Sequence, residues 1–98
     1  MPTLTVLYGI PSDPDAFRRH YDEVHVPLAR ALPGATALRY SLAVETLAGE
    51  HPVFASFHAE FPTREALDAA LASPEGQAAQ ADVPAFASGG VTILVEGD

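Results

Sequence analysis

The residues best suited to chemistry in this sequence lie on one predicted helix. His25 follows Tyr21 by four positions, and residues four apart are neighbours on a helix surface, so both rings can reach one ligand. A position near a helix C-terminus favours the imidazolium, whereas apolar burial favours the neutral ring, and together they can hold the histidine pKa near neutrality. The spacing therefore predicts His25 as a general acid–base and Tyr21 as a residue that orients a substrate oxygen. The alternatives are a structural histidine bonded to backbone and a core tyrosine.

Five further side chains are candidates for contact with a ligand. Tyr8 ends the first predicted strand and Tyr40 lies on the second, where either phenol could orient a ligand oxygen or could simply pack. His58 lies on the more polar face of its strand, which could line a barrel interior or a dimer seam. Phe17, from the apolar stripe of the helix, and Phe86, from a loop, complete the predicted ligand-binding set.

No metal or cofactor is predicted. On a regular α-helix His20 and His25 stand about 140° apart, and no HExxH-type pair exists, so we interpret His20 as solvated. The absence of cysteine excludes disulfides, thiol nucleophiles, thiolate zinc sites and iron–sulfur clusters. The Gly89-Gly90 pair precedes a strand instead of opening a helix, so no phosphate-binding loop is indicated.

Length and charge narrow the class of protein. The 98 residues predict one domain, 1–98, and a hydrophobic content of 48% with mean hydropathy +0.12 excludes a disordered polar chain. Five arginines, no lysine and thirteen acidic residues give a net charge of −8, which disfavours nucleic acids and anionic membranes as partners. No apolar run approaches the roughly 18 residues that cross a bilayer, and no secretion signal is apparent, so a soluble cytoplasmic protein is expected.

The first half of the chain predicts a strand followed by a helix. The β-branched and aromatic run of residues 3–8 reads as a strand. Asp13 should cap a helix that begins at Pro14. Its apolar face consists of Phe17, Tyr21, Val24 and Leu28. Because Pro27 has no amide hydrogen, we expect this helix to end or kink near His25, with one more turn over 28–32.

The remainder predicts a hairpin, a helical segment and a final strand. Alternation over residues 35–45 and again over 53–61, with a turn at 46–52, indicates an antiparallel hairpin. In the second strand Phe54, Ser56, His58 and Glu60 should share one face. Thr63 should cap a helix over 64–72, Ser73 restarts a helix to about residue 81, and residues 91–96 form the last strand. The order is βαββαβ, an α+β fold with both helices on one face of a four-stranded antiparallel sheet. Apolar residues on both strand faces predict that the open face pairs with a second copy.

Four segments of the chain resemble proteins of the EthD-domain family: TVLYG, HYDEVHVPLARALPG, LASPEGQAAQAD and FASGGVTILV. The resemblance covers nearly the whole chain, and His25-Val26-Pro27 with Leu28 matches its most distinctive stretch. It implies a ferredoxin-like fold whose sheets pair as a homodimeric α/β barrel, and a cavity for a small, mainly apolar ligand. The family takes its name from an operon associated with ethyl tert-butyl ether degradation. Some barrel relatives bind haem through a histidine, a role open in principle to His25 or His58.

The resemblance and the residues together lead to one functional hypothesis and one rival. Relatives in the barrel superfamily include polyketide cyclases, cofactor-independent monooxygenases, lactone isomerases and dehydrating or decarboxylating enzymes of phenolic metabolism. We therefore expect a cofactor-independent protein that acts on an apolar aromatic, polyketide-like or carbonyl metabolite, with His25 as the general acid–base. The rival is a non-catalytic barrel that binds a hydrophobic metabolite and in which His25 is structural.

Overall fold

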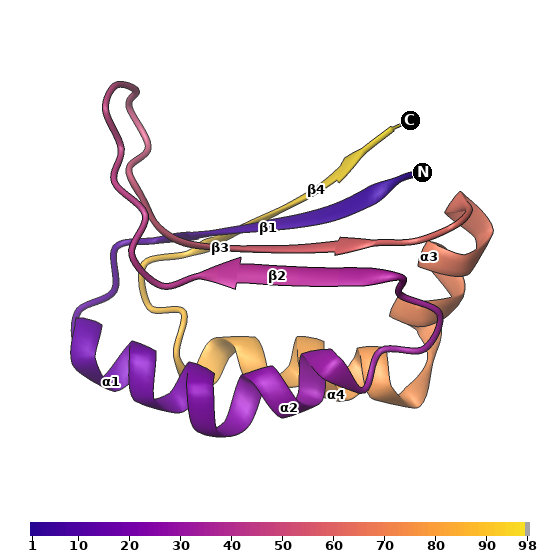
Figure 1. Cartoon of the computed structure of the whole chain (residues 1–98). Helices are drawn as coiled ribbons and strands as arrows, with labels where there is room; N and C mark the ends of the chain where they lie inside the picture. Colours follow the sequence, from indigo (N-terminus) through magenta and orange to yellow (C-terminus); the bar gives the residue numbers. More distant parts are fainter. Residues whose placement is uncertain (98) are drawn as a thin grey trace.

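The structure, a computed structural model, describes residues 1–97 and consists of a sheet covered on one face by helices (Figure 1). Its elements, in chain order, are β1 (Thr3–Gly9), α1 (Pro14–His20), the π-helix η1 (Tyr21–His25), α2 (Val26–Arg30), β2 (Ala37–Ser41), β3 (Val53–Glu60), α3 (Arg64–Ala72), α4 (Pro74–Asp82), the 3₁₀ turn η2 (Val83–Ala85) and β4 (Val91–Glu96). The strands are ordered β2-β3-β1-β4, and every neighbouring pair is antiparallel. This confirms the predicted α+β fold and the β2–β3 hairpin.

The helix starts follow from local side-chain chemistry. The Asp13 carboxylate accepts a hydrogen bond from the Ala16 amide at 3.1 Å, and the Thr63 hydroxyl accepts one from the Ala66 amide at 3.1 Å. Ser73 caps α4 in the same way. Each cap satisfies an amide that has no partner within its helix, which confirms the predicted starts.

The core lies between the sheet and the helices. Alternate residues of β1 and β3 face it because successive side chains on a strand point to opposite sides. The aromatic side chains Tyr8, Phe17, Tyr21 and Phe61 are at most 2% exposed and form its centre.

The apolar stripe of the first helix departs from the prediction after Tyr21. Val24 is 41% exposed and Leu28 only half-buried, whereas His25, Val26 and Ala29 are buried. The predicted stripe assumed a regular α-helix, but residues 21–25 form a π turn. A π turn contains one residue more than an α turn, so it changes the direction in which every later side chain points. The stripe therefore continues one residue later than the α-helical period requires.

A bulge in β3 corrects a second prediction. Gly9 pairs with Val53 and Tyr8 with Ala55, so Phe54 is an extra residue without a partner in β1. Its ring lies 5.1 Å from that of Phe17, on the helix side, instead of sharing the face of Ser56 and His58. The predicted strand over 35–45 is also too long: β2 ends at Ser41.

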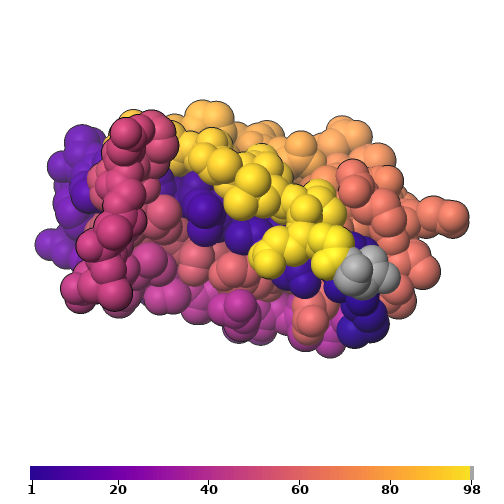
Figure 2. Space-filling model, turned by 90° about the horizontal axis from the view of Figure 1, so that it is seen from above, coloured from indigo at the N-terminus to yellow at the C-terminus, as the bar shows by residue number. Residues whose placement is uncertain are grey.

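The uncovered face of the sheet is more polar than predicted. The register places Thr5, Arg39 and His58 side by side on it, with Glu60 and Glu96 nearby. Figure 2 views the molecule from this side, with β4 as a yellow band and the loop between β2 and β3 at the left end. Most apolar side chains of β1, β2 and β3 instead point toward the helices.

Candidate functional site

A cavity of about 230 Å³ lies between the sheet and the helices α2 and α4. Apolar side chains line most of it, and three polar side chains join them: Tyr8 from β1, His25 from η1 and Gln80 from α4. A dry cavity of roughly 150 Å³ accommodates benzene, so this one has room for a single ring with a few substituents. The cavity lies within one chain, on the helix side of the sheet.

The π turn places His25 at this cavity. The Val26 amide donates its hydrogen bond to the Tyr21 carbonyl, five residues back. Pro27 has no amide hydrogen, and its ring would clash with the carbonyl four residues earlier in a regular α-helix, which a widened turn relieves. Because a π turn closes over five residues, His20 and His25 come to nearly the same side of the helix. The prediction that they stand far apart is wrong for this reason, and His20, predicted to be solvated, is only partly exposed.

Asp82 joins the two histidines. Its Oδ2 atom lies 3.0 Å from Nδ1 of His25, and its Oδ1 atom lies 2.8 Å from Nε2 of His20. The side chains of His25 and Asp82 are 7% and 13% exposed, and that of His20 is 29% exposed. Sequence reasoning missed Asp82 because it is 57 residues from His25; the one signal was its position at the end of the LASPEGQAAQAD segment.

The electrostatics of His25 follow from burial and from Asp82. Burial lowers the pKa of His25 because it penalises the charged ring; the Asp82 carboxylate opposes this, and His20 adds to the lowering. Among the described residues, Nε2 of His25 has no hydrogen-bond partner. With Nδ1 engaged by the carboxylate, Nε2 is the atom of His25 that remains for a ligand.

An aromatic cluster surrounds this histidine, formed by Tyr8, Phe17, Tyr21, Tyr40 and Phe86. Ring centroids lie 5.0 Å apart for Tyr21 and His25, 5.5 Å for Tyr21 and Tyr40, and 4.8 Å for Phe86 and His25. Of this cluster only Tyr8 lines the cavity, and burial raises the pKa of its phenol to about 12. The Tyr21 hydroxyl is buried without a hydrogen-bond partner, and burial raises its pKa as well.

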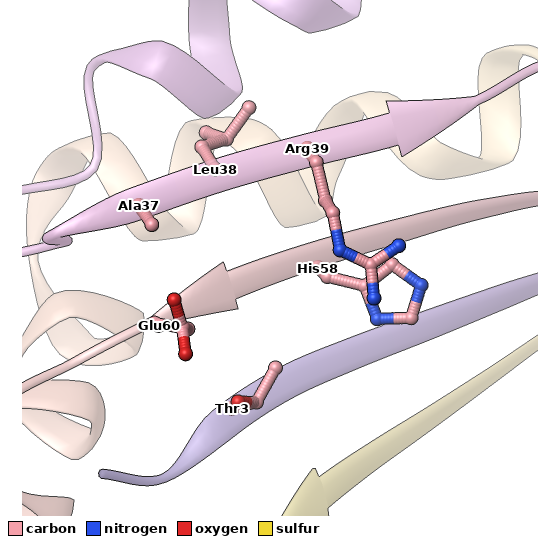
Figure 3. Close-up of a pocket in the computed structure, with 6 residues that line it drawn as sticks. All are labelled: Thr3, Ala37, Leu38, Arg39, His58 and Glu60. Carbon is pink, nitrogen blue, oxygen red and sulfur yellow. The ribbon is translucent and has the colours of Figure 1, made fainter.

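His58 lies on the opposite face of the sheet. A hollow of about 290 Å³ on that face is lined by Thr3, Ala37, Leu38, Arg39, His58 and Glu60 (Figure 3). Figure 3 shows the Arg39 and His58 side chains lying together above the strands. Partial burial lowers the pKa of His58, Arg39 adds to the lowering and Glu96 opposes it. The structure thus brings His25 and Tyr8 to one cavity and leaves His58 at another.

The structure bears on metal binding and on insertion into a membrane. Over residues 1–97, no group of three or more histidine, aspartate or glutamate side chains is arranged to hold a metal ion. Within the same residues, no helix has the length and apolar character needed to cross a bilayer.

The sequence of this chain is similar to those of known proteins. Residues 11–90 match the model of the EthD domain. The chain belongs to the EthD-domain family. It is 41% identical over 95 residues to an uncharacterised 11.0 kDa protein of the thcB-thcC intergenic region of Rhodococcus erythropolis, covering 96% of this chain and 91% of that one.

Solved structures agree with this assignment. An ethyl tert-butyl ether (EthD) family protein of Bacillus halodurans is 30% identical, with a TM-score of 0.89 over 100% of this chain and 98% of that one. A dimeric ferredoxin-like protein of unknown function from Thermobifida fusca is 14% identical, with a TM-score of 0.74 over 99% and 90% of the two chains. The EthD resemblance and the ferredoxin-like fold expected from the sequence are confirmed.

Proposed function

We propose that this EthD-domain protein binds a mostly apolar metabolite the size of one substituted ring in the cavity beside His25. The cavity volume of about 230 Å³ and its apolar walls support this size and polarity. His25 and Tyr8 supply polar atoms at the cavity wall, so the metabolite should carry an oxygen, such as a carbonyl or a phenol. An apolar aromatic or carbonyl compound of this size meets both conditions.

We further propose that His25 acts on this metabolite as a general acid–base without a cofactor. The observation that carries the proposal is a buried histidine at an apolar cavity, with one nitrogen held by a carboxylate and the other free. Burial favours the neutral ring, so Nε2 can accept a proton from the substrate and return it to a different atom of the same molecule. Isomerisation, dehydration, cyclisation and decarboxylation all use such a transfer. Tyr8 would orient the substrate oxygen, because it lines the cavity and Tyr21 does not.

Native mass spectrometry of the freshly purified protein, followed by a screen of small aromatic and carbonyl compounds, tests this function. We expect a retained or added ligand with the mass of one substituted ring. The variant His25→Gln should keep the fold and bind the ligand while turnover falls at least a hundredfold, because general acid–base catalysis typically contributes that much. His51→Gln, at an exposed histidine, is the matched control.

The rival function, binding without catalysis, gives a different result. If His25→Gln binds the ligand as tightly as the native protein and the native protein turns over none of the ligands found, the protein is a carrier. If His25→Gln lowers the melting temperature sharply and leaves turnover intact, the histidine is structural and the catalytic proposal fails.

We also propose that the protein forms a homodimer through the uncovered face of its sheet. Solved relatives are described as dimeric, and no helix covers this face (Figure 1). Arg39 makes no ion pair within residues 1–97, while Glu60 and Glu96 lie on the same face, so a twofold axis would bring opposite charges together. We expect a dimeric mass in sedimentation at micromolar concentration and dissociation by Arg39→Glu. Arg30→Glu, on an exposed helix position, is the control.

A further inference from the structure

We propose that Asp82 is the positioning residue that determines which ring nitrogen of His25 accepts a proton. We further propose that His20 regulates the His25–Asp82 pair by sharing the same carboxylate. This inference deepens the proposed function, on which it rests, because it assigns the control of the same site. Three elements meet here: Asp82 ends α4, His20 ends α1 and His25 ends η1.

The hydrogen bonds define the tautomer of His25. A carboxylate is an acceptor only, so the ring nitrogen that faces it must carry the hydrogen. Nδ1 lies 3.0 Å from Oδ2 of Asp82, and the neutral ring is therefore protonated at Nδ1. Nε2 then has a free lone pair and can act as a base. Without Asp82 the ring could turn or change tautomer, and Nε2 would present a hydrogen instead.

The Asp82 carboxylate is largely buried, which strengthens its electrostatic effect on neighbouring groups. The Asp82 side chain is 13% exposed, so its interaction with a neighbouring ring is only weakly screened by water. The negative charge favours the imidazolium form of His25 and opposes the effect of burial. Asp82 therefore keeps His25 basic enough to accept a proton.

His20 competes with His25 for the negative charge of Asp82. Its Nε2 atom lies 2.8 Å from Oδ1 of Asp82, and its side chain is 29% exposed, so solvent reaches this ring. A proton on His20 offsets the charge of Asp82 and lowers the pKa of His25. The other titratable groups facing His25 are the phenols of Tyr21 from η1 and Tyr8 from β1, which stay neutral near pH 7 because burial raises their pKa. A positive charge on His20 should thus act on His25 through the shared carboxylate.

Phe86 supports this reading of the geometry. Its ring lies 5.4 Å from that of His20 and 4.8 Å from that of His25, with interplanar angles of 28° and 60°. It packs against both imidazoles, which limits their rotation away from the carboxylate. The two histidines and Asp82 therefore form one packed unit.

Nitrogen NMR of the histidine side chains in the ligand-free protein tests the proposal. In the native protein we expect the neutral His25 ring to carry its hydrogen on Nδ1. Asp82→Asn keeps the shape but removes the charge, and should lower the proton affinity of His25 about tenfold or more. His20→Gln keeps an N–H donor for Asp82 but removes the competing charge, and should raise the proton affinity of His25 by about threefold. His51→Gln should leave it unchanged.

The outcomes separate this inference from the proposed function, because the measurement needs no ligand. A native His25 that carries its hydrogen on Nε2, or a proton affinity unchanged by Asp82→Asn, overturns the positioning role even if the cavity binds a ligand. If Asp82→Asn does not fold, the tautomer of His25 in the native protein still tests the positioning role. The regulatory role is overturned if the proton affinity of His25 does not rise in His20→Gln. Conversely, a cavity that binds no ligand refutes the proposed function and leaves the NMR result standing.

Discussion

Replacing Tyr21 by phenylalanine should stabilise the protein, although it removes a group from the centre of the core. The Tyr21 side chain is fully buried and its hydroxyl has no hydrogen-bond partner. A buried polar group left without a partner costs about 1–3 kcal/mol, whereas the small void left by one oxygen costs well under 1 kcal/mol. We therefore expect Tyr21→Phe to raise the free energy of unfolding by about 1 kcal/mol.

Thermal and urea denaturation of the ligand-free protein measure this change. In a domain of this size 1 kcal/mol corresponds to about 4–8 °C in melting temperature. The control is Tyr40→Phe, since Tyr40 is only half-buried and its hydroxyl is not a buried group without a hydrogen-bond partner. This substitution should change the free energy of unfolding by no more than about 0.5 kcal/mol. A loss of 1 kcal/mol or more in Tyr21→Phe would refute the reasoning, because it would mean that the hydroxyl is satisfied, with the neighbouring Tyr8 phenol as its nearest candidate partner.

Three further predictions follow from the titrating groups and from one glycine. The lowered pKa values of His25 and His58 mean that the unfolded chain binds more protons below about pH 6.5, so the free energy of unfolding should fall on acidification through that value, and fall less in His25→Asn; a flat pH profile in denaturant titrations contradicts this. At the alkaline end, burial raises the pKa of Tyr8 from 10.0 to about 12, so the free energy of unfolding should fall by up to about 3 kcal/mol as the pH rises between those values. Unfolding monitored by circular dichroism measures this loss. Gly76→Ala should cost more than 2 kcal/mol, since its Cβ would lie 2.7 Å from the Leu71 carbonyl oxygen; Gly97→Ala, where nothing lies within 4 Å, should be neutral in the same melts.

The parts of the fold that were predictable depend on short-range chemistry. Asp13, Thr63 and Ser73 cap helices through contacts three residues away, so the sequence contains everything that determines them. The two alternating segments with a turn between them likewise predicted that β2 and β3 pair as a hairpin. In contrast, the bulge at Phe54 adds a residue to one strand only, and a period of two carries no sign of which residue is extra.

The candidate site was predictable in its central residue and not in its partners. The choice of His25 as the candidate general acid–base rested on its position near the end of a helix and on the family resemblance, and neither fixed where the cavity lies. Asp82 comes from another helix, and His20 reaches it because a π turn replaces an α turn. Proline at position 27 predicted an irregularity but not its kind, since a kink, a break and a widened turn all relieve the same clash.

The π turn at Tyr21–His25 has a consequence for sorting the relatives of this chain. Its widened ring contains one residue more than an α turn, so the place of His25 in space depends on how many residues precede Pro27, as well as on which residues they are. A relative one residue shorter between Tyr21 and Pro27 would continue as a regular helix, and its histidine would rotate by about 100° away from the cavity and the carboxylate. Such a relative could keep every residue type of the site and still lack the site. Segment length, read together with an acidic residue at the position of Asp82, is therefore a better criterion than the histidine alone for deciding which relatives share this chemistry.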